Sequence, residues 1–118
     1  MKKLAIIMLA LAAAASATDL TGVWSGKGGR EDVRYGTVPQ TAQLALIQDG
    51  TSLSGTMKLN KGQPVKITSG SISGSQVVLA IVGPTGQVTG HFTQTGTQLS
   101  GKMTASNGQI YDFVFTKN

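Results

Sequence analysis

The sequence contains no cysteine and only one histidine, and these absences narrow what the protein can do. Without cysteine there is no disulfide, thiolate nucleophile or zinc–thiolate site. His91 has no acidic residue close to it in sequence with which to bind a metal. There is also no assembled Ser-His-Asp constellation, no phosphate loop and no nucleotide fingerprint. We therefore expect a protein that is not an enzyme and that uses neither a metal nor a cofactor.

Long hydrophobic runs are missing except at the start of the chain. Two lysines, an apolar run over Leu4–Ala15 and the small residues Ala15-Ser16-Ala17 predict a signal peptide over residues 1–17, cleaved after Ala17. The run is shorter than the roughly 20 residues of a spanning helix, although an uncleaved anchor is the alternative. We expect a periplasmic or secreted protein with no membrane span after cleavage.

Charge is scarce, because only 13% of the residues are Asp, Glu, Lys or Arg. Removal of Lys2 and Lys3 with the signal peptide lowers the formal net charge from +5 to +3. So small an excess does not predict nucleic-acid binding.

Helical periodicity is absent after residue 17, where glycine, threonine, serine and valine are abundant instead. Short alternating segments, separated by turn residues at intervals of about 8–12, are typical of an all-β sandwich or barrel. Short connections imply antiparallel neighbours, and we expect one domain over residues 18–118, an eight-stranded antiparallel up-and-down barrel. The expected strands are Gly22–Lys27, Ala42–Gln48, Leu53–Leu59, Pro64–Ser69, Gln76–Val82, Gln87–Gln94, Leu99–Ala105 and Gln109–Lys117.

Alternation assigns an apolar face and a polar face to most of these strands. The apolar set should face the interior and the polar set water, the inverse of a barrel embedded in a membrane. Gln76–Val82 is apolar on both faces and needs cover from a loop, a displaced N-terminus or another copy. The expected interior residues are Trp24, Leu44, Leu46, Leu53, Met57, Val65, Ile67, Leu79, Phe92, Leu99, Met103, Phe113 and Phe115.

One ten-residue pattern occurs twice, as QDGTSLSGTM over Gln48–Met57 and as QTGTQLSGKM over Gln94–Met103. Each copy reads as a glycine turn that leads into a strand with an inward leucine, a glycine at a bend and an inward methionine. The repeat therefore indicates shared hairpin geometry, and internal duplication is possible.

The segment Leu20-Thr-Gly-Val-Trp-Ser-Gly26 resembles the first strand of the calycin superfamily, which includes lipocalins, avidins and small periplasmic inhibitor barrels. The closing Phe113–Lys117 looks most like the avidins. The resemblance implies that Trp24 packs across one end of the barrel, where lipocalins add an arginine and this sequence offers only Lys117. It does not extend to biotin, because the further tryptophans are absent and Gly26 and Arg30 replace the family's Asn and Ser.

The longest expected connection is Gly28–Gln40, and we interpret the glycines at its start as a flexible loop. The connection carries Arg30, Glu31, Asp32, Arg34 and Tyr35, and loops of this kind often hold recognition residues. Two guanidinium groups beside a tyrosine suit a carboxylate or the acidic patch of a partner. The alternative is a solvated loop whose opposite charges pair with each other.

Our leading hypothesis is an exported protein that binds a small apolar or amphipathic ligand in the barrel mouth, with Gln48 and Gln94 near a rim. Whether the lumen is open or filled stays undecided at this point. The alternatives are a protein-binding module, such as an inhibitor of a periplasmic or secreted enzyme, or a structural envelope protein. The candidate ligand-binding residues are Trp24, Arg30, Arg34, Tyr35, Leu46, Met57, Phe92, Met103 and Phe113.

Overall fold

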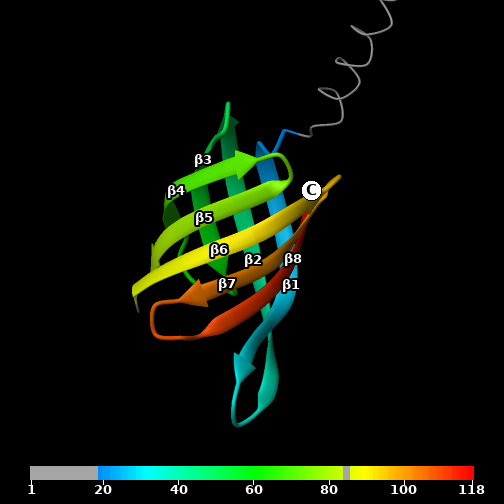
Figure 1. Cartoon of the computed structure of the whole chain (residues 1–118). Helices are drawn as coiled ribbons and strands as arrows, with labels where there is room; N and C mark the ends of the chain where they lie inside the picture. The colour runs from blue at the N-terminus through cyan, green and yellow to red at the C-terminus, as the bar shows by residue number, and fades with distance from the viewer. Residues whose placement is uncertain (1–18, 84–85) are drawn as a thin grey trace, which may run out of the picture.

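A computed structural model describes residues 19–83 and 86–118, so the predicted signal peptide lies outside the described residues. The described chain forms a closed barrel of eight antiparallel strands in chain order (Figure 1). This confirms the predicted eight-stranded antiparallel barrel. Within the described ranges, no helix has the length and apolarity to cross a membrane. The strands are β1 (Gly22–Asp32), β2 (Gly36–Asp49), β3 (Ser52–Leu59), β4 (Val65–Ser73), β5 (Gln76–Gly83), β6 (Gly86–Thr95), β7 (Gln98–Ala105) and β8 (Ile110–Lys117).

The barrel closes where β1 pairs with β8, in a register that runs from Trp24 opposite Lys117 to Arg30 opposite Tyr111. Closure removes the unpaired strand edges along this seam. The predicted bounds of β3, β5, β6, β7 and β8 lie within one residue of the observed ones at each end.

The predicted long loop over Gly28–Gln40 is wrong, because β1 and β2 continue through it as a hairpin that turns only at Val33–Tyr35. This hairpin projects below the barrel in Figure 1. Its glycines serve close packing: a Cβ on Gly28 would overlap the carbonyl oxygen of Asp112 in β8. Pro39 fits because β2 pairs with β3 only from Ala42 onward, which leaves that side of the strand free of ladder bonds.

The fourth strand is also longer than predicted, since it continues to Ser73 instead of ending at Ser69. Its pairing with β5 shifts register between Ile67 and Ser69. A bulge of this kind breaks the alternation on which the prediction relied.

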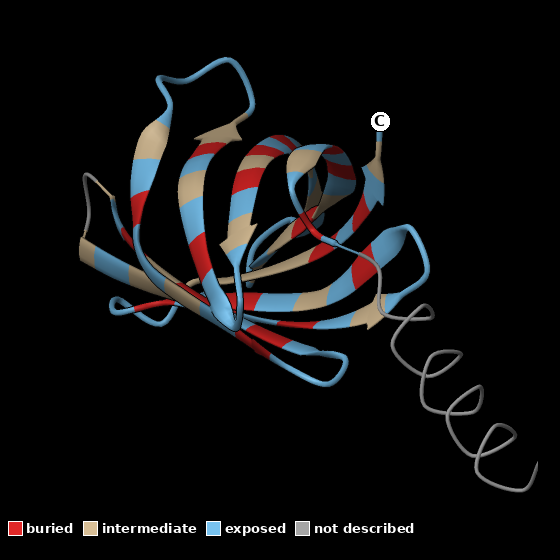
Figure 2. Cartoon of the chain, turned by 90° about the horizontal axis from the view of Figure 1, so that it is seen from above, coloured by how far each residue is buried: buried red, intermediate tan, exposed pale blue. Residues whose placement is uncertain are grey.

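The core consists of inward side chains from all eight strands. Of the 13 predicted interior residues, all are buried except Val65, which is half-buried. Bands of buried residues alternate with exposed ones along the strands (Figure 2). The rings of Phe92, Phe113 and Phe115 meet in the interior, with centroids 5.6 Å apart for Phe92–Phe115 and 5.4 Å apart for Phe113–Phe115.

The sequence repeat forms equivalent hairpins, β2–β3 and β6–β7. Gln48 Nε2 donates to the carbonyl of Gly50 at 3.0 Å, and Gln94 Nε2 donates to that of Gly96 at 3.3 Å. Further along, Leu46 lies opposite Gly55 and Phe92 lies opposite Gly101. The predicted shared hairpin geometry is confirmed.

The outer face of β5 carries the apolar residues that the sequence marked as needing cover. Val78 and Val82 are exposed, so no described segment covers them. Their neighbours across the strands are polar: His91 lies opposite Val78, and Gln87 lies opposite Val82. The apolar strip is therefore narrow.

Candidate ligand-binding site at the hairpin end of the barrel

The two ends of the barrel differ in how their interior side chains are covered. We call one end the Trp24 end, where β2–β3, β4–β5 and β6–β7 turn, and the other the hairpin end, where β1–β2, β3–β4 and β7–β8 turn. The difference between them decides where a ligand has access.

The Trp24 end is closed by the segment that precedes β1. Trp24 and Leu20 have no exposed surface, and Trp24 Nε1 donates to the carbonyl of Leu20 at 2.9 Å. The backbone N–H of Leu20 donates to Gln48 Oε1 at 2.9 Å. These bonds fix the chain across this end of the barrel. Trp24 therefore packs across this end, as the resemblance implies.

Lys117 lies over the Trp24 ring at the same end of the barrel. Its Nζ lies 6.0 Å from the centroid of the Trp24 ring and donates to the carbonyl of Asp19 at 2.9 Å. The carboxylate of Asp19 in turn accepts a hydrogen bond from the backbone N–H of Thr21. This bond is the main cause, and a bond from the Thr21 side chain the next, of a lowered pKa of the exposed Asp19 carboxyl. The contacts of Lys117 add a second layer over the tryptophan.

A depression of about 440 Å³ lies outside this plug, and Gln48 and Gln94 both line it, near a rim as expected. The amide of Gln48 is already engaged with Leu20 and Gly50. Beneath the depression, Ile72 is 9% exposed. The interior side chains at the Trp24 end therefore expose little of their surface to a ligand.

The hairpin end is different, because interior side chains there are only half-buried. Leu59, Val65, Val88 and Tyr111 pack against the core from β3, β4, β6 and β8 while remaining partly open to solvent. Val38 of β2 and Arg30 of β1 are also half-buried, and they lie opposite each other in the register. We call these six residues the mouth ring: Arg30, Val38, Leu59, Val65, Val88 and Tyr111.

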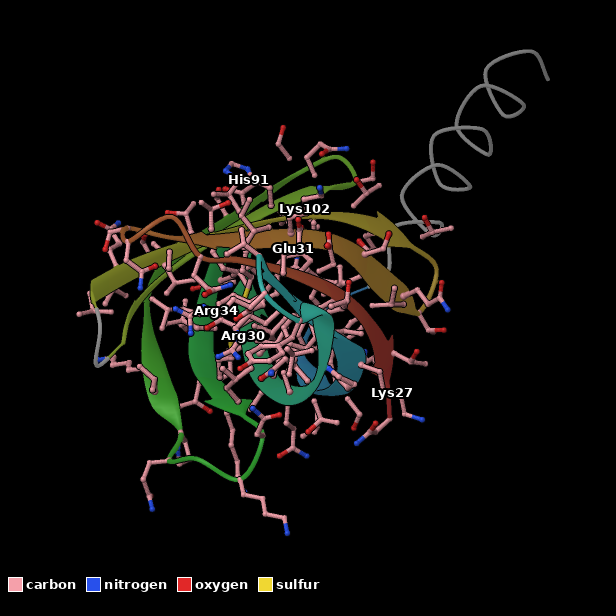
Figure 3. The ribbon with its side chains drawn as sticks, turned by 90° about the horizontal axis from the view of Figure 1, so that it is seen from below. Lys27, Arg30, Glu31, Arg34, His91 and Lys102 are labelled. Atoms are coloured by element: carbon pink, nitrogen blue, oxygen red, sulfur yellow. The ribbon has the colours of Figure 1, made fainter. Side chains whose placement is uncertain are left out.

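Arg30 faces inward because the alternation of β1 continues unbroken from Trp24 through Gly26 and Gly28. Seen from below, Arg30 and Arg34 both lie over the interior of the ring of strands, whereas Lys27 and His91 lie on its outer side (Figure 3). The Nε atom of Arg30 is buried, and it has no hydrogen-bond partner among the described residues. The mouth therefore combines apolar walls with an unpaired cationic donor.

The tip of the β1–β2 hairpin holds the other residues of the predicted loop. Asp32 Oδ1 accepts the backbone N–H of Arg34 at 2.7 Å and that of Tyr35 at 3.1 Å, which fixes the turn. Val33 is fully exposed and Tyr35 is 76% exposed. Loop charges that pair with each other are not seen: within residues 19–83 and 86–118 the ion pair found joins Lys102 and Asp112.

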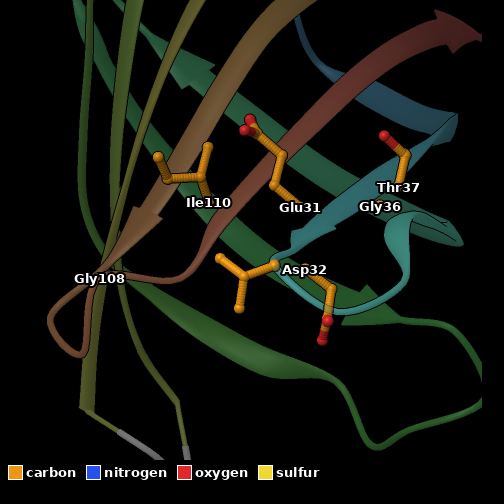
Figure 4. A pocket seen from close by; sticks show the side chains of 7 residues that line it. Glu31, Asp32, Gly36, Thr37, Gly108 and Ile110 are labelled. Carbon is orange, nitrogen blue, oxygen red and sulfur yellow. The ribbon is translucent and has the colours of Figure 1, made fainter.

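An outer notch of about 370 Å³ separates this hairpin from the β7–β8 turn (Figure 4). Glu31, Thr37 and Ile110 line it, and all three belong to the outward-facing set of their strands. Gln109 Nε2 donates to the carbonyl of Glu31 at 2.6 Å, which ties the hairpin to the β7–β8 turn. Asp32 and Gly36, the last paired residues before the turn, also line the notch, so it adjoins the tip of the hairpin.

The structure separates the predicted ligand-binding residues into three groups. Only Arg30 is in the mouth ring, and Arg34 and Tyr35 are exposed at the hairpin tip. The other six are buried in the core, each with no more than 7% of its surface exposed: Trp24, Leu46, Met57, Phe92, Met103 and Phe113. A ligand reaches those six only if core side chains move aside.

Sequence reasoning missed the rest of the mouth ring as site residues. Alternation placed Val65 in the interior, and the predicted strands contained Leu59, Val88 and Tyr111. The sequence signal that could have identified these residues as site residues is their position beside the turns at one end of the strands. Val38 lies in the segment predicted to be a loop, so alternation assigned it no inward face.

Comparisons with known proteins bear on the fold alone. No protein-family model and no curated protein matches the chain. Among solved structures, it resembles the redesigned β-barrel mFAP1 bound to DFHBI, with a TM-score of 0.61, 17% identity, and coverage of 83% of this chain and 94% of that chain. It also resembles the redesigned barrel b11L5F_LGL, with a TM-score of 0.65, 17% identity and coverage of 84% and 91%. A fluorescence-activating β-barrel designed de novo gives a TM-score of 0.61, 14% identity and coverage of 87% and 97%.

Proposed function

We propose that this protein is a non-catalytic binding protein that takes a small apolar or amphipathic ligand at the hairpin end of its barrel. The observation that carries the proposal is the contrast between the two ends. Trp24 and Leu20 are fully buried, while all five apolar or aromatic side chains of the mouth ring stay partly exposed. A ligand that covers this half-buried apolar surface removes it from water, which is favourable.

Two further points support the proposal. One designed barrel that shares this fold is described as bound to the small molecule DFHBI, so an eight-stranded barrel of this size is compatible with such a ligand. The calycin-like Gly-x-Trp at Gly22–Trp24 adds a resemblance to exported barrels. We also propose that the protein is exported to the periplasm or secreted, with its signal peptide cleaved after Ala17.

Binding of the neutral dye Nile red, followed by its fluorescence, tests the proposal. A matched pair of substitutions separates the mouth from the outer wall. Val88→Trp fills the mouth from β6, while Val82→Trp places the same ring on the exposed face of β5 next to it. We expect Val88→Trp to weaken dye binding by about tenfold or more, which corresponds to ~1.4 kcal/mol, and Val82→Trp to leave it unchanged.

Thermal melting followed by circular dichroism checks that both variants stay folded. Equal dye binding by the two variants, or no dye binding by the wild type at tens of micromolar, would contradict a site in the mouth.

A second candidate function, a protein-binding module, is favoured by the hairpin tip. Val33 and Tyr35 are strongly exposed, and the bonds from the backbone N–H groups of Arg34 and Tyr35 to Asp32 order the backbone of the turn that carries them. An ordered backbone under exposed side chains lowers the entropic cost of association.

For this candidate we expect a Val33→Ser/Tyr35→Ser variant to lose a partner that the wild type retains from a periplasmic or secreted extract. A Val82→Ser variant, which removes an exposed apolar side chain elsewhere, serves as the control and should retain it. The loss should be about tenfold or more in affinity, because exposed aromatic residues often dominate interfaces. Identical retention by all three proteins would exclude the hairpin tip as the interface.

A further inference from the structure

The guanidinium of Arg30 has no counter-charge in the described parts of the chain. Its two cross-strand neighbours, Val38 and Tyr111, carry no negative charge. Glu31 is on the opposite face of β1, and the carboxylate of Asp32 is used by the turn at Arg34 and Tyr35. Arg30 thus stands in the mouth without a carboxylate partner.

Such an arrangement is unfavourable in the free protein. Buried polar groups in native proteins are nearly always hydrogen-bonded, and an exception calls for an explanation such as a ligand. Arg30 Nε is buried without a partner, beside apolar and aromatic side chains. A ligand that supplied the missing acceptor would therefore bind more tightly than one of equal size without it.

The guanidinium group also limits which acceptor fits. Its N–H donors form a rigid planar fork that matches the two oxygens of a carboxylate. A carboxylate that accepts from both Nε–H and a terminal N–H of Arg30 gives the unpaired Nε a partner and also neutralises the charge of the guanidinium. Because Nε is buried in the free protein, this pairing requires the Arg30 side chain to change its rotamer when the ligand binds.

The depth of the mouth limits the rest of the ligand. Tyr111 lies at the level of Arg30, and its ring stacks on that of Phe113, with centroids 6.4 Å apart. Phe113, one step further in, is only 2% exposed and packs on Phe115. The apolar part of a ligand therefore contacts the outermost layer of side chains: Val38, Leu59, Val65, Val88 and Tyr111.

We propose that the mouth ring recognises an amphipathic carboxylate, with the carboxylate paired to the Arg30 guanidinium and the apolar body against the half-buried side chains beside it. The inference rests on the proposed function and specifies its ligand class. Arg34, exposed at the hairpin tip, has no part in it.

The test compares decanoate with 1-decanol, which share one chain length and differ in the head group, by isothermal titration calorimetry. We expect the wild type to prefer decanoate by about tenfold to a hundredfold, the range of a charge-assisted hydrogen-bonded pair. Arg30→Gln should abolish this preference, so that the affinities for decanoate and decanol become equal. Arg30→Lys, which keeps the charge without the fork, should retain part of it.

Arg34→Gln is the matched control, because it removes the same positive charge from the same hairpin at an exposed position. It should keep the full preference for decanoate. Equal binding of decanoate and decanol by the wild type, or an equal loss in Arg34→Gln and Arg30→Gln, overturns the inference.

The two proposals fail separately. If Nile red and decanol bind but decanoate is not preferred, only the carboxylate inference is overturned. If neither the dye nor either decyl compound binds, the proposed function itself fails. Melting curves establish that each variant is folded, and the wild-type comparison decides the matter even if Arg30→Gln does not fold.

Discussion

Replacement of Gly55 by alanine should be among the most damaging single changes in this protein. We expect Gly55→Ala to lower the free energy of unfolding by about 3–5 kcal/mol, since it combines overpacking with backbone strain. A Cβ at this position would overlap the carbonyl oxygen of Ala45 in the facing strand, and the backbone has a φ of +135°. A domain of this size has only about 5–15 kcal/mol of stability, so a loss of that size should also reduce the yield of folded protein.

Urea unfolding followed by circular dichroism measures this effect, and the same hairpin provides the control. Gly50 also has a positive φ, of +64°, but a Cβ there meets nothing within 4 Å. Gly50→Ala should therefore cost only about 1 kcal/mol, the conformational penalty alone. If the two variants are equally stable, then the close approach of β2 and β3 at Gly55 is not required.

The repeat extends this prediction to the other copy. A Cβ on Gly101 would overlap the carbonyl oxygen of His91, so Gly101→Ala should also be more destabilising than Gly50→Ala. The common constraint explains why Leu-Ser-Gly-x-Met occurs in both hairpins: the glycine lets the strands approach where the barrel bends.

The second large effect concerns the only tryptophan. We expect Trp24→Ala to cost about 3–5 kcal/mol, as for other large-to-small changes at fully buried aromatic residues. The indole is fully buried, and its N–H bond to Leu20 holds the segment that closes this end. Urea unfolding followed by circular dichroism is the measurement, since the variant has no tryptophan fluorescence.

Two milder variants divide this effect into its parts. Trp24→Phe keeps a ring but leaves the carbonyl of Leu20 without its donor, which should cost about 1–2 kcal/mol. Lys117→Met keeps the apolar stem and removes the ammonium near the ring, for about 0.5–1 kcal/mol. A Trp24→Ala variant that unfolds at the same urea concentration as Lys117→Met would show that Trp24 does not close the barrel as described.

Most of the fold could be predicted from the sequence, because strand alternation and turn residues are local signals. Asp49-Gly50 and Asn107-Gly108 marked turns that the structure contains. The loop prediction for Gly28–Gln40 fails because adjacent glycines are also typical of flexible segments. Gly28 instead admits the backbone of β8, a constraint that depends on a strand more than 80 residues away.

The candidate site was harder to predict, because alternation tells which side chains face inward but not how far along the barrel axis they lie. Phe92 and Val88 belong to the same inward face of β6, yet only Val88 is near the hairpin end. Height along the axis depends on the register between neighbouring strands, which no single strand's sequence specifies. The charge of Arg30 makes it a candidate ligand-binding residue from sequence alone. Its inward orientation follows only from the continuation of β1.

Where a ligand binds can be read directly from a titration of the ¹⁵N-labelled protein with decanoate or 1-decanol. We expect the backbone amide signals of Val65, Val88 and Tyr111 to shift progressively, while the indole N–H of Trp24 and the amide of Leu20 stay in place. That result would locate the ligand at the hairpin end. Shifts confined to Trp24, Leu20 and the turns beside them, or to the exposed outer face of β5, would contradict a binding site in the mouth ring.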